Sequence, residues 1–316
     1  MDEFEIIRRY FSTGYPARED VVLGVGDDGA LTRLRDGEEL VTVTDTLVAG
    51  THFPPELAAE AVAHRALAAN LSDLAAMGAA PRWFTLALAL PVAEPAWLEA
   101  FAAGLRQLAG RFDTALVGGD TVRGPLAVTI TALGAVPAGQ ALGRSGAASG
   151  DGIFLTGSSG DAGWTWQALA EGLELDADDP LHRRFMFPEP RVAEGIALRG
   201  LATAAIDVSD GLHVDLGRLL AASGVGGEAN VESLPLSAAL TAQAGETRAR
   251  ELALTGGDDY ELCFTVPADN EAPLLAMAVA WPCRVTRIGQ VLSTPGMRWH
   301  QAGELLAPPA AGFRHF

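Results

Sequence analysis

The sequence contains no lysine, so all 22 basic side chains are arginine. This absence excludes several chemistries, because a Walker A loop, a protein-kinase fold and Schiff-base catalysis each need a lysine amine. Cysteine is nearly as scarce. Cys263 and Cys283 stand in apolar runs without CxxC or Cys/His spacing, and we interpret both as small buried apolar residues. The 6 histidines form no HxxxH pair, which argues against a zinc site.

Long apolar runs are absent as well. No segment approaches about 18 uninterrupted apolar residues, and the acidic N-terminus has no signal-peptide pattern, so we expect a cytoplasmic protein that does not enter a membrane. Positive charge is in deficit: 40 acids against 22 bases give a net charge of −18, which would repel the phosphates of a nucleic acid. We therefore expect no nucleic-acid partner.

What the chain does have is enough length and apolar content for two folded domains. It has 316 residues, 49% of them hydrophobic and 20% charged. Residues 137–152 are rich in Gly, Ala and Ser and show little periodicity, which favours a boundary there. We predict an α/β (α+β) fold with an N-terminal domain over residues 1–137 and a C-terminal domain over residues 138–316.

Apolar runs predict strands in both halves, and apolar residues at helical spacing predict helices between them. The predicted strands are 21–25, 40–44, 83–90, 115–117, 126–136, 153–156, 204–208, 262–266 and 284–288. The predicted helices run from Pro55 to Asn70, onward from Pro95, and over 161–171, 191–198 and 212–222.

Aspartate recurs where these runs end, beside a glycine or a hydroxyl residue. Six groups show it, of which only 72–73 is on a helix-like segment: 27–28, 44–46, 72–73, 118–121, 207–211 and 256–259. Each group taken alone is compatible with an ordinary turn, because Gly and Asp are common turn residues. The repetition favours a function, since turn chemistry would use Asn, Ser and Pro equally.

Carboxylates that converge cannot all stay ionised without cations. Oxygen-rich, lysine-free groups suit Mg²⁺, which binds a few carboxylates together with water and substrate phosphates. The glycines beside these aspartates would let backbone N–H groups approach phosphate oxygens, and arginine would be the side-chain cation. We therefore hypothesise that the partner is a polyphosphate carried on several Mg²⁺ ions.

Nine segments spread over nearly the whole chain carry a family resemblance. They are Gly24-Val-Gly-Asp-Asp-Gly-Ala30, Thr44-Asp-Thr-Leu-Val-Ala-Gly-Thr-His-Phe53, Asn70-Leu-Ser-Asp-Leu-Ala-Ala-Met-Gly78, Gly118-Gly-Asp-Thr121, Gly143-Arg-Ser-Gly-Ala147, Pro188-Glu-Pro-Arg191, Asp207-Val-Ser-Asp-Gly-Leu212, Gly256-Gly-Asp-Asp-Tyr-Glu-Leu262 and Gly312-Phe-Arg-His-Phe316. In this order they resemble the thiamine-monophosphate kinases, which belong to the superfamily of aminoimidazole-ribonucleotide synthase and selenophosphate synthetase.

The resemblance implies transfer of the γ-phosphoryl group of ATP to thiamine monophosphate, which yields thiamine diphosphate. It implies an N-terminal ATP- and Mg²⁺-binding domain whose sheet pairs across a homodimer, and a C-terminal α/β domain that closes over the nucleotide. The implied Mg²⁺ ligands are Asp28, Thr44, Asp45, Asp73, Asp120, Asp207 and Asp210. The implied nucleotide contacts are Gly119, Asp120, Arg144 and Ser209, and the implied substrate contacts are His52, Asp258 and Phe313.

Three positions depart from the family pattern. Asp258 stands where relatives usually carry glutamate, Phe313 replaces a tryptophan that stacks on the substrate, and Ala102 replaces an aromatic near the adenine. We expect these departures to change binding more than chemistry.

Two other functions stay open. The first is an ATP-activating synthase of the same superfamily; a selenide-handling relative would need a reactive N-terminal cysteine, whereas both cysteines lie beyond residue 260. The second is a nucleotide- and Mg²⁺-binding protein that has lost turnover. That protein would bind ATP but release no ADP when thiamine monophosphate is added.

Overall fold

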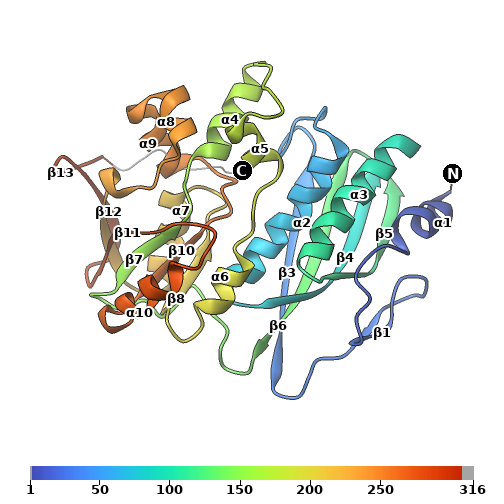
Figure 1. Cartoon of the computed structure of the whole chain (residues 1–316), viewed down its shortest axis with the longest axis horizontal. Coiled ribbons are helices and arrows are strands. Elements are labelled where there is room, and N and C mark those ends of the chain that lie inside the picture. Colours follow the sequence, from blue (N-terminus) through green and yellow to red (C-terminus); the bar gives the residue numbers. More distant parts are fainter. Residues whose placement is uncertain (1, 308–316) are drawn as a thin grey trace. The chain divides into compact units, whose positions relative to one another are not determined.

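The computed structural model describes residues 2–307. The chain divides into two compact units (Figure 1): unit 1 comprises Met1–Leu74 and Ala79–Gly139, and unit 2 comprises Ala75–Gly78 and Gln140–Phe316. Strands and helices occur in both units, which confirms the predicted α/β class. Within residues 2–307, no helix is both long enough and apolar enough to cross a membrane.

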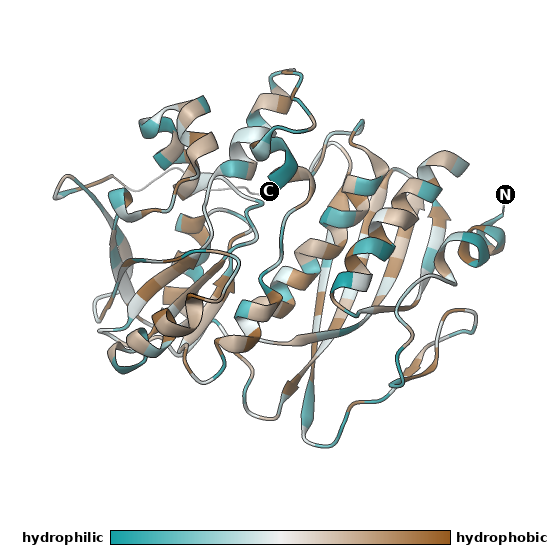
Figure 2. Ribbon diagram, in the orientation of Figure 1, coloured by the Kyte–Doolittle hydropathy of each residue, from teal (hydrophilic) through white to brown (hydrophobic). Residues whose placement is uncertain are grey.

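Unit 1 contains a four-stranded sheet with the order β3-β6-β4-β5. Its strands are β3 (Glu38–Val48), β4 (Ala80–Leu90), β5 (Ala115–Arg123) and β6 (Ala127–Pro137). β6 is antiparallel to β3 and to β4, whereas β4 and β5 are parallel. Hydrophobic residues run along these strands in Figure 2. Side chains of β6 alternate between buried and half-buried, as expected for a sheet with one covered face.

Two long helices, α2 (Ala59–Ala76) and α3 (Pro95–Arg111), cover one face of the unit 1 sheet (Figure 1). Pro95 begins α3, and the side chain of Glu94 caps it by accepting a hydrogen bond from Trp97 N. The buried face of α3 repeats at three- and four-residue spacing: Leu98, Phe101, Ala102, Leu105 and Leu108. The unit also contains α1 (Glu3–Ile6), a π-helix (Ile7–Phe11), and the short strands β1 (Val21–Leu23) and β2 (Leu31–Thr32).

Unit 2 contains a seven-stranded sheet with the order β13-β12-β9-β11-β7-β10-β8. Its strands are β7 (Gly152–Thr156), β8 (Ala204–Asp207), β9 (Gly226–Asn230), β10 (Leu262–Val266), β11 (Val285–Leu292), β12 (Gly296–Gln301) and β13 (Glu304–Leu305). β7 and β10 are buried at every residue. Phe154 pairs with Phe264 across these two strands, and their rings stack at 5.8 Å. The core of this sheet therefore lies at these two strands, which stand between β11 and the edge strand β8.

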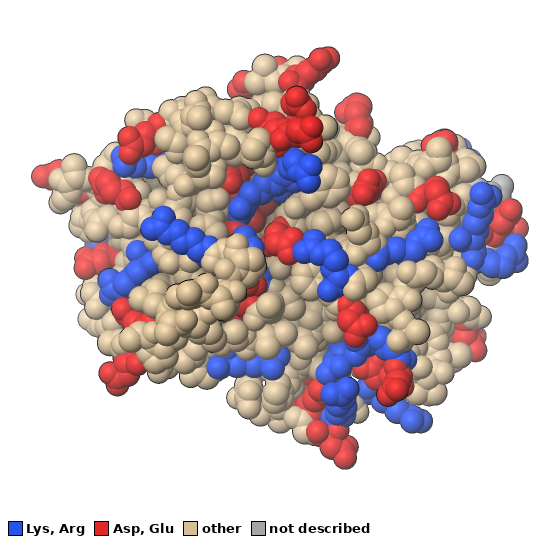
Figure 3. Space-filling view, in the orientation of Figure 1, with Lys and Arg blue, Asp and Glu red and all other residues tan. Residues whose placement is uncertain are grey.

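The helices of unit 2 connect and flank these strands. They are α4 (Asp161–Ala170), α5 (Pro180–Met186), α6 (Val192–Ala197), α7 (Leu212–Ala222), a 3₁₀-helix (Val231–Ser233), α8 (Ala238–Ala244), α9 (Glu246–Thr255) and α10 (Ala268–Ala278). On the face drawn in Figure 3, acidic and arginine side chains are interspersed. α9 pairs them locally, Arg248 with Glu251 and Arg250 with Glu246, each at 2.7 Å. Exposed pairs of this kind contribute little to stability.

Several sequence predictions need correction. α2 begins at Ala59 rather than Pro55, because Leu57 N donates to Pro54 O in a turn that precedes the helix. Two aspartates predicted at strand ends lie inside strands, Asp45 in β3 and Asp120 in β5. Cys263 is buried as predicted, but Cys283 is half-buried and contacts Glu194.

Candidate functional site

A pocket of 470 Å³ in unit 1 is lined by two of the predicted aspartate groups. The turn at Gly26–Asp28 forms one wall and residues 118–121 of β5 form another. Phe4, Ile7 and Phe11, from the N-terminal helical turns, add an apolar wall. Asp28, Gly119 and Asp120, which are far apart in sequence, therefore share one pocket. Its carboxylate oxygens suit a hard cation that carries a phosphate group, and its apolar wall suits a planar apolar group.

Glycine is required in β5 because of how closely β5 approaches β4. Gly119 has φ +151°, and a Cβ built there would lie 1.9 Å from the carbonyl oxygen of Leu86. A side chain at this position would collide with the neighbouring backbone. The carboxylate of the next residue, Asp120, lies against its own backbone, where Oδ1 accepts a hydrogen bond from Thr121 N at 2.8 Å. The close approach of the strands thus leaves the backbone at residues 118–120 open toward the pocket.

Thr44 and Asp45 do not point the same way, although both were predicted to bind metal. They are adjacent in β3, and successive side chains of a strand project from opposite faces. Thr44 Oγ1 is hydrogen-bonded to Thr131 Oγ1 at 2.9 Å, and Thr46 pairs with Thr129 in the same way. If both residues bind one ion, Thr44 must contribute through its backbone.

His52 lies in the turn that follows β3. Its Nδ1 accepts a hydrogen bond from Val48 N at 3.0 Å, and His52 N donates to Val48 O at 2.9 Å. The ring is therefore fixed by its own turn. In a neutral imidazole with Nδ1 accepting, the hydrogen is on Nε2, which makes Nε2 the donor atom of this ring. Asp73, from the same predicted set, is half-buried on α2.

In unit 2 the predicted loop Asp207–Asp210 follows β8 directly. Asp207 is 4% exposed at the end of the strand. Asp215 of α7 was not predicted as functional, yet its Oδ2 accepts from Ser209 N at 3.0 Å and from Asp210 N at 2.9 Å. Arg218 bridges the two acids, at 2.5 Å from Asp210 and 2.7 Å from Asp215. An acidic residue in the first turn of a helix was the only sequence signal for this anchor.

Burial raises the pKa of Asp215, and the nearby charge of Asp210 acts in the same direction. Hydrogen bonds from the two loop N–H groups and the charge of Arg218 oppose this increase. Ser209 and Asp210 therefore stand on a loop whose backbone N–H groups are already occupied. A ligand therefore meets the side chains of Ser209 and Asp210 rather than their backbone N–H groups.

The segment Gly256–Tyr260 packs against this loop. Asp258 N donates to Ser209 O and Tyr260 N donates to Val208 O, both at 2.9 Å. Asp258 and Tyr260 have φ of +65° and +52°, a left-handed conformation that non-glycine residues rarely adopt. Tyr260 Oη donates to Asp258 Oδ1 at 3.0 Å. The carboxylate predicted to contact substrate is therefore on a strained and well-supported segment.

Comparison with known proteins matches both units to one family. The N-terminal domain of AIR synthase related proteins matches residues 26–136, and the C-terminal domain matches residues 148–300. The thiamine-monophosphate kinase of Salmonella typhimurium is 44% identical over 318 residues, covering 99% of this chain and 98% of that protein. The chain belongs to the thiamine-monophosphate kinase family.

Solved structures of this family have the same fold. The thiamine-monophosphate kinase of Stenotrophomonas maltophilia superposes with a TM-score of 0.86 at 45% identity, over 96% of each chain. AaThiL, solved in complex with AMPPCP and TMP, has a TM-score of 0.78 at 29% identity, over 99% of this chain and 94% of that one.

Unit 2 of this thiamine-monophosphate kinase family member also contains a buried ionic cluster that the sequence did not predict. Glu261 is fully buried and accepts from Arg191 Nε at 2.7 Å, Arg191 Nη2 at 2.6 Å and Thr156 Oγ1 at 2.5 Å, and also from Arg184. Burial would raise the pKa of Glu261, but the hydrogen bond from Arg191 and the charges of both arginines lower it below its ordinary value. Glu261 and the two arginines thus form a buried ionic cluster at the residue that follows Tyr260.

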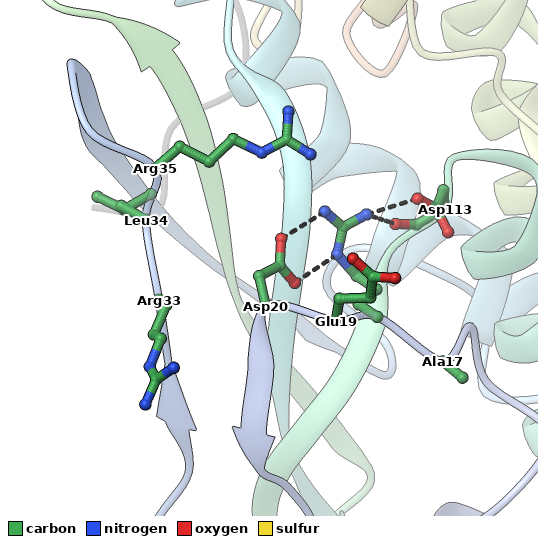
Figure 4. A pocket seen from close by; sticks show the side chains of 8 residues that line it. Ala17, Glu19, Asp20, Arg33, Leu34, Arg35 and Asp113 are labelled. Atoms are coloured by element: carbon green, nitrogen blue, oxygen red, sulfur yellow. Dashed lines mark hydrogen bonds and ion pairs between the residues drawn. The ribbon is translucent and has the colours of Figure 1, made fainter.

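A second pocket of unit 1, of 370 Å³, contains opposite charges that neutralise one another (Figure 4). Arg18 bonds Asp20 through two nitrogens, at 2.9 and 2.7 Å, and Asp113 at 2.5 Å. Burial would raise the pKa of Asp20, but hydrogen bonds from Arg18 and Trp83 lower it. The bidentate pair lies within the segment before β1, and the bond from Arg18 to Asp113 joins that segment to the loop after α3, so the role of this group is structural.

The oxygen donors of the larger pocket fit Mg²⁺. Asp27, Asp28 and Asp120 line it, and no ion pair involves them among the described residues. Within residues 2–307, no group of three or more His, Cys, Asp or Glu side chains is positioned to hold a metal ion. Mg²⁺ commonly takes only one or two carboxylates and completes its shell with water and phosphate oxygens. Arg144 is exposed, and Phe313 lies outside the described residues.

Proposed function

We propose that this protein phosphorylates thiamine monophosphate to thiamine diphosphate, with ATP as the phosphoryl donor. The observation that carries the proposal is the end-to-end match to a thiamine-monophosphate kinase at 44% identity. A relative solved with AMPPCP, a non-hydrolysable ATP analogue, and TMP has the same fold. As a member of this family, the chain is a phosphotransferase that uses a phosphate group as acceptor.

The reaction joins two phosphates, so it needs no covalent intermediate on the protein and no strong general base. The acceptor oxygen is already anionic near neutral pH, because the second pKa of a phosphate monoester is about 6. The main barrier is the repulsion between two polyanions that must be aligned. The protein has no lysine to offset this charge. Bound Mg²⁺ would neutralise phosphate charge and orient the reacting oxygens.

In unit 1, we assign Asp28, Asp45, Asp73 and Asp120 to Mg²⁺, with Thr44 contributing through its backbone. Gly119 and Asp120 would contact the nucleotide, because the strand approach at Gly119 leaves that backbone accessible in the pocket. His52 Nε2 would donate a hydrogen bond to the thiamine substrate, since Nδ1 is occupied by Val48 N.

In unit 2, we assign Asp207 and Asp210 to Mg²⁺ and Arg144 and Ser209 to the nucleotide. Arg218 already contacts Asp210, so its guanidinium would compete with a metal ion for that carboxylate. Asp258 and Phe313 would contact the thiamine substrate. Asp258 is one methylene shorter than the glutamate of relatives, and its left-handed backbone fixes where that shorter carboxylate points.

A homodimer is the assembly we propose. β3 is an edge strand of 11 residues, and an unpaired edge is a template for another strand. Leu40 of β3 is 47% exposed. Other large apolar side chains of unit 1 are exposed as well: Val22 46%, Leu23 43%, Leu31 53% and Leu34 37%. We call β3 with its exposed Leu40 the edge patch. Such an edge favours a protein partner, and a second copy of the chain fits it because a self-complementary edge can pair with itself. The cytoplasmic location stays a prediction.

The deciding experiment measures ADP and thiamine diphosphate together. The purified chain is incubated with ATP and Mg²⁺, with and without thiamine monophosphate, and both products are quantified by chromatography. We expect equal amounts of the two products, formed only with the thiamine substrate. ADP without thiamine diphosphate would instead indicate another ATP-activating enzyme of the superfamily. ATP binding without turnover would indicate a non-catalytic protein.

A further inference from the structure

Asp259 is a buried carboxylate to which none of the roles above has been assigned. It is 2% exposed, and it stands between Asp258 and Tyr260, the two residues of its segment with left-handed backbones. Its Oδ2 accepts from Gly160 N and from Ser159 Oγ, both at 2.7 Å. Its Oδ1 has no hydrogen-bond partner among the described residues. A buried polar atom without a partner is costly, so it calls for a compensating role.

The contacts of Asp259 fasten its segment to the start of α4. Glycines permit the close approach: a Cβ at Gly160 would lie 2.7 Å from Ala253 N, and a Cβ at Gly163 would lie 2.7 Å from the Cα of Gly256. This close packing restricts the position of the Gly256–Tyr260 backbone against α4. The Asp259 carboxyl group lies at the N-terminus of that helix, where backbone N–H groups favour a carboxyl oxygen.

We propose that Asp259 is a positioning residue for the thiamine substrate, because it holds Asp258 in the left-handed conformation that aims its carboxylate. The inference rests on the proposed function and deepens it. Left-handed backbones at Asp258 and Tyr260 are strained, and strain of this kind persists only where surrounding contacts impose it. The backbone bonds to Val208 and Ser209 hold the segment on one side. Asp259 is the side-chain anchor on the other.

The nucleotide side has an anchor of its own. The backbone N–H groups of Ser209 and Asp210 are held by Asp215, which is on α7, whereas Asp259 bonds the start of α4. Loss of Asp259 should displace Asp258, whose backbone bond to the loop is Asp258 N to Ser209 O, whereas Asp215 continues to hold the N–H groups of Ser209 and Asp210. A positioning role therefore predicts a larger effect on the thiamine substrate than on ATP, whereas general loss of structure would affect both.

The test compares KM values for both substrates in Asp259→Ala, Asp259→Asn and wild type. For Asp259→Ala we expect kcat/KM for thiamine monophosphate to fall on the order of 10- to 100-fold, since small displacements of a positioned group cost that much, with KM for ATP nearly unchanged. Asparagine keeps the volume and an acceptor for Gly160 N. It should restore kcat/KM to within about threefold of wild type, because one neutral hydrogen bond is worth little net.

Asp151→Asn is the matched control. Asp151 is also a buried carboxylate of unit 2, 5% exposed, and it accepts from Ala148 N at 3.0 Å and Thr203 Oγ1 at 2.7 Å. It should lower the melting temperature without changing either KM. Should Asp259→Ala not fold, Ser159→Ala removes one of the two donors to Asp259, and a several-fold rise in KM for the thiamine substrate alone is expected.

The outcomes keep the two proposals apart. If the wild-type chain makes no thiamine diphosphate, the proposed function fails before any variant is compared. If the wild type is active but the Asp259 and Ser159 variants keep the wild-type KM for thiamine monophosphate, only the positioning role is overturned. It is also overturned if both KM values rise together, because that pattern would show general disorder of the site.

Discussion

The aspartates of this protein differ in whether an arginine side chain forms an ion pair with them. Asp210 has Arg218 at 2.5 Å and Asp20 has Arg18, whereas Asp27, Asp28 and Asp120 share a pocket without an ion pair among the described residues. A carboxylate that no arginine neutralises is available to a metal ion, so we expect these three residues to act on a ligand.

Asp120→Asn tests this expectation. Asparagine keeps the acceptor for Thr121 N, so the melting temperature should stay close to that of wild type, while kcat falls by about 100-fold or more because a carboxylate proposed to bind Mg²⁺ is lost. Steady-state kinetics and calorimetry check both parts. Glu19→Gln, an exposed acid in the pocket of Figure 4, is the control and should change neither. Wild-type kcat in Asp120→Asn would remove this residue from the mechanism.

Asp259 should make stability depend on pH. Burial raises its pKa to about 7; the charge of Arg184 on α5 and the Ser159 hydrogen bond oppose the increase, and the charge of Asp161 on α4 adds to it. Between about pH 4, where an unfolded aspartate titrates, and about pH 7, the folded state binds a proton that the unfolded state has lost. The contribution of this group to the free energy of unfolding therefore decreases as pH rises through that window.

Asp259→Asn removes this titration. The melting temperature of wild type relative to that of Asp259→Asn should therefore be highest near pH 4 and should decline toward pH 7, then stay level. Calorimetry of both proteins across this range measures the difference. A difference that stays constant with pH would contradict the raised pKa.

At the scale of elements, the pairing of β4 with β5 shapes the 470 Å³ pocket that we propose for the nucleotide. The two parallel strands shift register between Phe84 and Thr85, just before the contact of Gly119 with Leu86. The close approach is possible only because residue 119 has no side chain. The pocket is thus a property of two strands together and of neither alone.

Gly119→Ala should separate these strands. The added Cβ would lie 1.9 Å from Leu86 O, so the backbone must move, at a cost of about 3 kcal/mol in the free energy of unfolding. Gly118→Ala is a matched control for stability, because a Cβ there meets nothing within 4 Å. The midpoint of denaturant unfolding should fall in the first variant only. Equal behaviour of the two variants would show that the close contact relaxes easily.

At the scale of the whole molecule, self-association should depend on the exposed edge of unit 1. Light scattering should give twice the chain mass of 32.9 kDa for wild type, and Leu40→Arg on β3 should shift it toward the single-chain mass, because a charge would be buried at the interface. Val279→Arg is the control. Val279 is 86% exposed in unit 2 and is outside the edge patch, so its variant should stay dimeric. A monomeric wild type would refute the assembly.

The sequence by itself determined the α/β class, the helix from Pro95, the central strands and the aspartate groups, because these depend on local periodicity and on residue chemistry. It missed β9, whose sequence Gly-Gly-Glu-Ala-Asn has no apolar pattern and becomes a strand only between β11 and β12. Three features depend on tertiary structure alone. Thr44 and Asp45 point to opposite faces of β3, Asp215 anchors the 207–210 loop, and Asp259 bonds the N-terminus of α4. Those facts depend on contacts between residues distant in sequence, and no local pattern encodes such contacts.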